Sequence, residues 1–153
     1  MLESRNAWDC VLCAFGTVLD LTYEQMQALV GHDGSGIVRK DLPEPLCRLG
    51  YPVDHLVEAL IASDYACTEL TPEIILDGEI VLREPDWKWF QEKHMMGHKG
   101  VLFGEGKSIP HCVAWDGELV WDPNGYCYAF NENRNGAFTA WSFMRIDKIV
   151  LWK

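Results

Sequence analysis

The first third of the chain has the hydrophobic pattern of helices. Apolar side chains recur there at steps of three and four residues, at Trp8, Val11, Leu12, Phe15, Val18 and Leu19. This spacing predicts an amphipathic helix with one buried face. Residues 20–22 interrupt the pattern, and Thr22 followed by Gln25 is a capping-box pair. We therefore expect a second helix that begins after Thr22 and ends at Gly31.

The middle of the chain is less regular. Residues 42–49 have the pattern of a short helix, with Gly50 as its C-terminal stop. Residues 57–62 fit either a helix or a strand, residues 80–83 fit a strand, and residues 87–96 fit a helix. This region gives no clear indication of function.

From Gly100 onward, short apolar runs alternate with turns rich in Gly and Asn. The predicted strands are 101–103, 111–115, 119–122, 126–130 and 142–152. Helices followed by an antiparallel sheet are typical of an α+β fold. We expect one domain over residues 1–153, in which an N-terminal helical lobe packs on a C-terminal antiparallel sheet.

Composition and charge narrow the function classes. The chain has 153 residues, of which 48% are apolar and 12% aromatic, which favours a buried core. Its net charge of −10 argues against a nucleic-acid partner and against docking to anionic lipid. The sequence has neither a signal-peptide pattern nor an apolar run long enough to span a bilayer. We expect a cytoplasmic protein that has no membrane partner and whose six cysteines are mostly reduced.

A predicted hairpin brings a histidine and an aspartate together. Asp116-Gly117 lies between two apolar runs, and Asp-Gly is the strongest local signal for a two-residue hairpin turn. With this turn, Trp115 faces Glu118, and His111 faces Asp122 farther along the ribbon. Directly opposed residues point to the same face, with Cβ atoms roughly 4.5–5.5 Å apart. The pattern therefore predicts an imidazole held by a carboxylate.

A histidine and an aspartate in this arrangement commonly activate a nucleophile, and Cys10 is the main candidate. It begins the first predicted helix, where free backbone N–H groups and the helix dipole stabilise a thiolate. The same N–H groups can stabilise an oxyanion, to which the side-chain amide of Asn6 could add a donor. Cys13, one turn farther into the helix, is the competing candidate, and its side chain is expected to pack in the core.

Several short segments together resemble a known enzyme family. They are Asn6-Ala-Trp-Asp9-Cys10, Asp33-Gly-Ser-Gly36, Arg48-Leu-Gly-Tyr51, His111-Cys-Val-Ala-Trp-Asp-Gly117 and Val120-Trp-Asp-Pro-Asn-Gly125. In this order they resemble papain-like cysteine peptidases, especially the compact bacterial and phage forms near the bacteriocin-leader peptidases. The resemblance covers about residues 4–51 and 99–125.

The resemblance implies a papain-like fold and a thiol hydrolase acting on a peptide or protein substrate. It implies Cys10 as nucleophile, His111 as general base and then acid, and Asp122 as the residue that orients His111. The leader peptidases usually carry Gly after the cysteine, where this chain has Val11. They carry an oxyanion Gln six residues before it, where this chain has Ser4, and Asn6 is the substitute in this chain. No cofactor and no metal are implied.

Other functions remain open at this stage. Cys10-x-x-Cys13 also has the spacing of a redox pair or of half a zinc site, although a structural zinc site needs four ligands. The same scaffold could be a non-catalytic interaction module, such as a phage-encoded inhibitor or a virion component, which would suit the acidic charge. A peptidoglycan amidase would use the same order of Cys, His and Asp. The sequence does not indicate the oligomeric state.

Overall fold

The computed structural model describes residues 1–6, 8–36, 41, 50–71, 73–82, 90–105, 110–130 and 139–150. The predicted helix at 42–49 lies outside these residues, as does the beginning of the helix predicted at 87–96. In chain order the elements are α1 (Cys10–Leu19), α2 (Tyr23–Val30), α3 (Val53–Ala62), β1 (Tyr65–Leu70), β2 (Glu73–Leu76), β3 (Glu79–Leu82), the π-helix η1 (Gln91–Met95), β4 (Gly100–Glu105), β5 (Pro110–Trp115), β6 (Val120–Asp122), β7 (Tyr126–Tyr128) and β8 (Thr139–Lys148).

The two N-terminal helices form as the sequence predicts. Helix α1 begins at Cys10, and helix α2 begins after Thr22. The Thr22 hydroxyl accepts a hydrogen bond from the Gln25 backbone, and the Gln25 side chain accepts one from the Thr22 backbone. This reciprocal pair satisfies two N–H groups that the helix itself leaves open. Gly31 ends α2 with a φ of 90°, the left-handed conformation that favours glycine.

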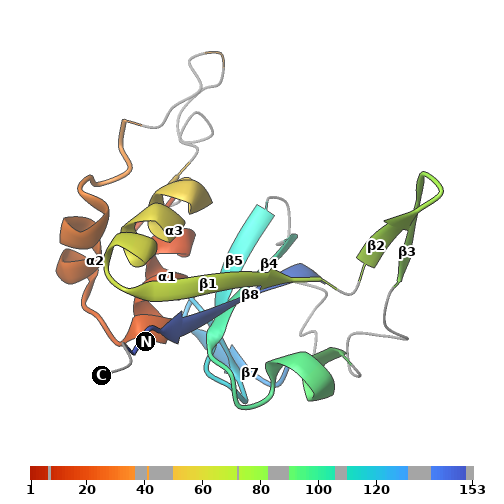
Figure 1. Ribbon diagram of the computed structural model, residues 1–153. Helices are drawn as coiled ribbons and strands as arrows, with labels where there is room; N and C mark the ends of the chain where they lie inside the picture. Colours follow the sequence, from red (N-terminus) through yellow and green to blue (C-terminus); the bar gives the residue numbers. More distant parts are fainter. Residues whose placement is uncertain are drawn as a thin grey trace.

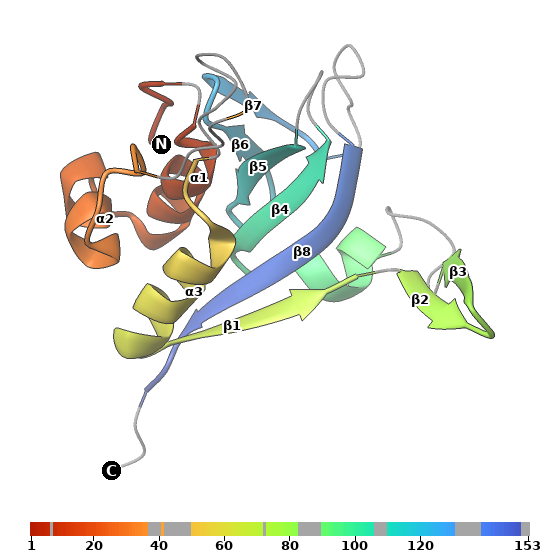
Figure 2. The same ribbon diagram turned by 90° about the horizontal axis from the view of Figure 1, so that it is seen from above.

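The main sheet has six strands in the order β1-β8-β4-β5-β6-β7, and all neighbours are antiparallel. Figure 2 shows these strands side by side, with β8 running between β1 and β4. Strands β2 and β3 form a separate two-stranded hairpin, which stands away from the main sheet in Figure 1. The α+β prediction is confirmed at this level, with a helical N-terminal region and an antiparallel sheet.

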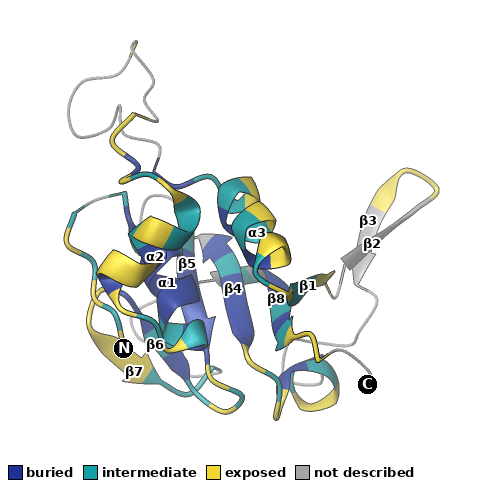
Figure 3. Cartoon of the chain, turned by 60° about the vertical axis from the view of Figure 1, so that its left-hand side comes forward, coloured by how far each residue is buried: buried dark blue, intermediate teal, exposed yellow. Residues whose placement is uncertain are grey.

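Buried apolar side chains lie on both faces of the sheet. One cluster joins the three helices to alternate strand residues, among them Val101, Cys112, Ala114 and Met144. The other contains the intervening residues Leu102, Val113, Trp115 and Phe143, together with Phe90 before η1 and Met95 at its end. Figure 3 shows the buried residues gathered where α1 meets β4 and β5. This packing fixes α1, and therefore Cys10, against the strand that carries His111.

The register predicted for the β5–β6 ribbon is wrong by two positions. Trp115 pairs with Val120 and not with Glu118, so four residues connect the two strands. His111 therefore lies diagonally across the ribbon from Asp122, not directly opposite it. A shift of one residue would send the two side chains to opposite faces, whereas a shift of two preserves the alternation.

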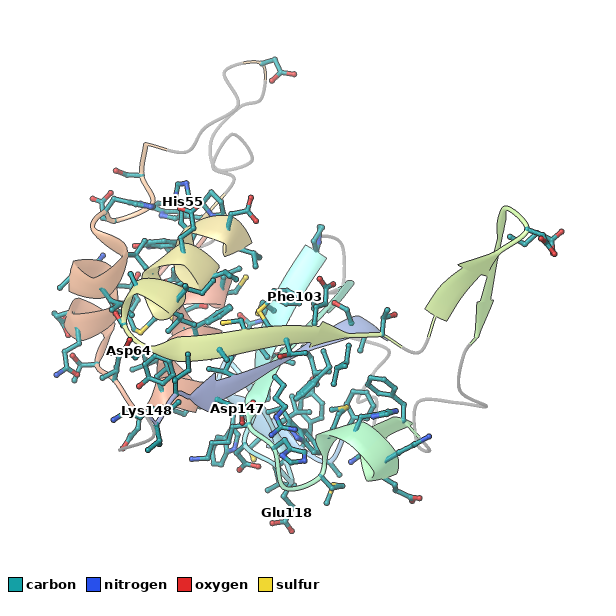
Figure 4. The ribbon with its side chains drawn as sticks, viewed as in Figure 1. His55, Asp64, Phe103, Glu118, Asp147 and Lys148 are labelled. Carbon is teal, nitrogen blue, oxygen red and sulfur yellow. The ribbon has the colours of Figure 1, made fainter. Side chains whose placement is uncertain are left out.

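The reason for the longer loop lies in Asp116. Its carboxylate accepts hydrogen bonds from the backbone N–H groups of Glu118 (2.8 Å) and Leu119 (2.7 Å). A two-residue type I′ turn needs a positive φ at both central residues. Gly117 has one (104°), but Asp116 is not among the described residues with positive φ. Glu118 lies at the tip of this loop and points away from the rest of the molecule (Figure 4).

Several further elements differ from the expectations. Strands β1 and β2 were not predicted, and β1 pairs along its whole length with β8. The ambiguous segment 57–62 belongs to helix α3. Within the helix predicted at 87–96, the described residues form the short π-helix η1, which ends at Met95.

Candidate active site

Cys10 is the first residue of α1, as predicted, and is partly exposed. The first backbone hydrogen bond of the helix runs from the N–H of Cys13 to the carbonyl of Asp9 (3.0 Å). The N–H groups before Cys13, including that of Cys10, therefore have no partner within the helix. A thiolate or an oxyanion at this point lies at the positive end of the helix dipole.

His111 and Asp122 form a short hydrogen bond. Nε2 of His111 lies 2.9 Å from Oδ1 of Asp122, and the two side chains are only 11% and 9% exposed. The same carboxylate oxygen accepts the backbone N–H of Asn124 (2.8 Å), and the Asp122 carbonyl accepts that of Gly125 (2.9 Å). The turn after β6 thereby fixes the carboxylate, and the carboxylate fixes the ring. This arrangement leaves Nδ1 as the nitrogen available to a nucleophile.

The His111 imidazole also forms a hydrogen bond with the Cys10 side chain. Burial of the ring lowers the pKa of His111, but hydrogen bonds with Asp122 and Cys10, and the charges of both, outweigh burial. The pKa of His111 is therefore raised from 6.5 to about 9. At neutral pH the ring carries a proton, and an imidazolium between a carboxylate and a thiol stabilises the thiolate. The structure thus brings together the three residues that the sequence suggested.

Asn6 is oriented by a local turn. Its Oδ1 accepts a hydrogen bond from the backbone N–H of Trp8 (3.1 Å). Only the carbonyl oxygen of an amide can accept this bond, so the orientation of the side chain is fixed. The Nδ2 group is left as the donor, as an oxyanion-binding role requires.

The remaining described cysteines lack these features. Cys13 is fully buried, and its Sγ lies 3.5 Å from the carbonyl oxygen of Glu3. Burial, followed by the charge of Asp9, raises the pKa of the Cys13 thiol to about 12. Burial also raises the pKa values of Cys67, Cys112 and Cys127. These observations favour Cys10 over Cys13 as the nucleophile, while Cys47 lies outside the described residues.

Sequence reasoning missed the surroundings of Asp9. This carboxylate is fully buried, and its Oδ2 accepts hydrogen bonds from the Arg5 backbone N–H (2.8 Å) and the Tyr23 hydroxyl (2.7 Å). The Arg5 guanidinium lies 3.9 Å from the centre of the Tyr23 ring. The sequence offered one signal, an acidic residue directly before Cys10, to which no role was assigned.

The N-terminal residues connect the two sides of the site. The backbone N–H of Leu2 donates to the Thr17 hydroxyl in α1 (2.9 Å). Two residues later, the N–H of Ser4 donates to the carbonyl of Pro123 (2.8 Å), directly after Asp122. The segment before the nucleophile is thus attached both to its own helix and to the turn that holds the carboxylate.

His32 and His55, which are far apart in the sequence, lie side by side and are partly exposed. Nε2 of His32 lies 2.9 Å from Nδ1 of His55, and the His32 ring stacks on Tyr51. His55 lies in the first turn of α3 (Figure 4). Among the described residues, no group of three or more His, Cys, Asp or Glu side chains is placed to hold a metal ion.

No protein-family model matches the chain, and no curated protein matches it significantly. Within the part of the chain that the structure describes, no helix combines the length and apolar character needed to cross a bilayer. A functional proposal for this protein therefore depends on the arrangement of Cys10, His111 and Asp122. Chemically, that arrangement can form a thiolate, deliver a proton and hold an oxyanion.

Proposed function

We propose that this protein is a cysteine-dependent acyl-transfer enzyme of papain-like architecture, which cleaves an amide, peptide or isopeptide bond. The observation that carries the proposal is the contact of one imidazole with a carboxylate on one side and with a thiol at a helix N-terminus on the other. A structural histidine does not need both partners. This combination is typical of an activated thiol nucleophile.

In the proposed reaction, the Cys10 thiolate attacks the carbonyl carbon of the substrate. The carbonyl oxygen becomes an oxyanion, and the Cys10 backbone N–H and the Asn6 Nδ2 group donate hydrogen bonds to it. The carbon–nitrogen bond then breaks while the His111 imidazolium gives its proton to the leaving amine. The products of this half-reaction are a free amine and a thioester on Cys10.

The second half-reaction regenerates the enzyme. Neutral His111 removes a proton from water or from another nucleophile. The deprotonated nucleophile attacks the thioester carbon and takes the acyl group. The thiolate leaves, and His111 is again an imidazolium beside it. Asp122 keeps Nε2 of the ring occupied throughout, so that Nδ1 stays directed at the reacting atoms. A peptide or protein substrate suits this chemistry.

The first test is the reactivity of Cys10. Iodoacetamide should label Cys10 at pH 7 at least about tenfold faster than Cys127, because only a thiolate is nucleophilic. Cys127 is the internal control, since it is more exposed than Cys10 but lies outside the triad. Peptide mapping by mass spectrometry gives both rates in one sample. His111→Gln should abolish the difference between the two cysteines.

Slow labelling of Cys10, equal to that of Cys127, would contradict the proposal and favour a non-catalytic interaction module. The substrate class is a second question. Electrophilic peptide, ubiquitin-like and muropeptide probes can be compared on the natural protein and on Cys10→Ala. Capture by the muropeptide probe alone would favour a peptidoglycan amidase over a peptidase.

A further inference from the structure

We propose that Asp9 is a positioning residue for the oxyanion donors of this site, and that Tyr23 is the side chain through which α2 holds it in place. This inference rests on the function proposed above. In this proposal neither Asp9 nor Tyr23 contacts the substrate. Both act by fixing the loop that carries Asn6 and leads into Cys10.

The geometry begins with two nested rings of hydrogen bonds. The inner ring joins Asn6 Oδ1 to the N–H of Trp8 (3.1 Å). The outer ring joins Asp9 Oδ2 to the N–H of Arg5 (2.8 Å) and encloses the inner one. Asp9 thus closes the loop that orients the Asn6 amide, and it is also the residue whose carbonyl begins α1.

Tyr23 ties this loop to the next helix. Its hydroxyl donates to the same Oδ2 atom (2.7 Å), and its ring is almost fully buried. Tyr23 is the first residue of α2 and directly follows the capping-box residue Thr22. The Arg5 side chain lies over the Tyr23 ring and donates to Glu24 (3.0 Å), which holds the outer face of the loop.

The second observation is that burying Asp9 is unfavourable for folding. The carboxylate is fully buried, and its Oδ1 has no hydrogen-bond partner. Burying a carboxylate with an unsatisfied oxygen is unfavourable. An acceptor that left no oxygen unpaired would satisfy the Arg5 and Tyr23 donors at a smaller cost. A role in placing the neighbouring donors accounts for the acceptor at this position.

Two reagents separate this role from a general structural one. Attack of the thiolate on p-nitrophenyl acetate forms a tetrahedral oxyanion, transfers the acetyl group to Cys10 and releases p-nitrophenolate. Alkylation by iodoacetamide displaces iodide and forms no oxyanion. The first reaction therefore needs the oxyanion donors, whereas the second needs only the thiolate. The Cys10→Ala protein gives the background of the other cysteines for both reagents.

The test compares Tyr23→Phe with Tyr51→Phe in the full chain. Both tyrosines are buried, but the Tyr51 hydroxyl contacts Gln27 and not Asp9. Tyr23→Phe should lower the rate of the p-nitrophenolate burst about tenfold, because the donors become misplaced but are not removed. Its iodoacetamide rate at Cys10 should stay within about twofold of the natural protein. Tyr51→Phe should change neither rate.

A second pair of variants, Asp9→Asn and Asp9→Ala, tests the same inference if Tyr23→Phe folds poorly. Asp9→Asn retains an acceptor oxygen and should keep more of the burst rate than Asp9→Ala, with thermal unfolding measured alongside. An unchanged burst rate in both Tyr23→Phe and Asp9→Ala overturns the inference, as does an equal fall of burst and alkylation rates. If the natural protein itself gives neither a burst nor fast alkylation at Cys10, the proposed function fails, and the inference fails with it.

Discussion

The two sides of the candidate site are built in different ways. On the helical side, the loop that carries Asn6 and leads into Cys10 depends on a few side-chain hydrogen bonds, chiefly those of Asp9 and Tyr23. On the sheet side, His111 lies within a strand paired with β4, and Asp122 lies in a strand paired with β7. In the sheet, many backbone hydrogen bonds together hold each side chain in place. In the loop before α1, single side chains do so.

The contrast between the two sides indicates which property each substitution should change. Changes to His111 or Asp122 should alter the proton chemistry and leave the backbone in place. Changes on the helical side should alter geometry, because few other contacts hold the loop. Substitutions on the two sides test this contrast, and their effects should differ widely in size.

The largest effect is expected for His111→Gln. The variant cannot protonate the leaving amine or activate water, so the rate of amide cleavage should fall by about 10²- to 10⁴-fold. The measurement is single-turnover cleavage of a substrate found by probe capture. Glu118→Gln is the control, since Glu118 is exposed and lies in the loop of the same ribbon. A His111→Gln protein that keeps more than about a tenth of the rate would remove His111 from the mechanism.

The same histidine should make folding stability depend on pH. The pKa of His111 rises from 6.5 to about 9 on folding, so the folded state binds the proton more tightly than the unfolded state does. The resulting stabilisation is fully present below pH 6.5 and is lost as the pH rises through 9. Its size is about 3 kcal/mol. Urea unfolding at several pH values measures it.

The control for this prediction is a histidine elsewhere in the chain. Between pH 6 and 9.5 the natural protein should lose about 3 kcal/mol more stability than His111→Gln does. His98→Gln should behave like the natural protein, because His98 is not part of the His111–Asp122 pair. Parallel curves for all three proteins would show that the Asp122–His111–Cys10 contact does not stabilise the fold.

The Asp-Gly pairs show what the sequence could and could not predict about the sheet side. Asp77-Gly78 forms a two-residue turn, in which both residues have positive φ and Leu76 pairs with Glu79. Asp116-Gly117 does not, because the Asp116 side chain accepts the N–H groups of its own loop. The dipeptide alone does not decide between these outcomes. The His111–Asp122 contact was still predicted, because the two-residue error preserved the alternation of side chains.

On the helical side, local patterns were sufficient for the elements but not for their contacts. The periodicity and the capping box predicted α1 and α2 and placed Cys10 at a helix start. The hydrogen bond between Asp9 and Tyr23 depends on how the two helices pack, which no local pattern encodes. Strand β1 was missed for a related reason. It lies at the sheet edge and is only partly buried, so its apolar residues do not alternate clearly.

A smaller effect is expected for Gly50→Ala, which tests the helical side from outside the loop. Gly50 has a φ of 80°, and a Cβ there would lie 2.5 Å from the carbonyl oxygen of Trp8. Strain and collision together should cost about 1–3 kcal/mol of unfolding free energy. Gly31→Ala is the matched control, with a φ of 90° and nothing within 4 Å of the added Cβ. Equal losses in the two variants would show that the approach to Trp8 is unimportant.

The smallest effect is expected for Thr22→Ala, which removes the N-cap of α2. Loss of one capping hydroxyl typically costs about 1 kcal/mol, which urea unfolding can measure, and Thr22→Ser should restore most of it. The burst rate with p-nitrophenyl acetate should fall less than about twofold, because the buried ring of Tyr23 still fixes its hydroxyl near Asp9. A fall as large as that of Tyr23→Phe would mean that the start of α2, and not the packing of the Tyr23 ring, sets the position of the loop. The helical side would then depend on backbone structure in the way that the sheet side does, and the contrast between the two sides would disappear.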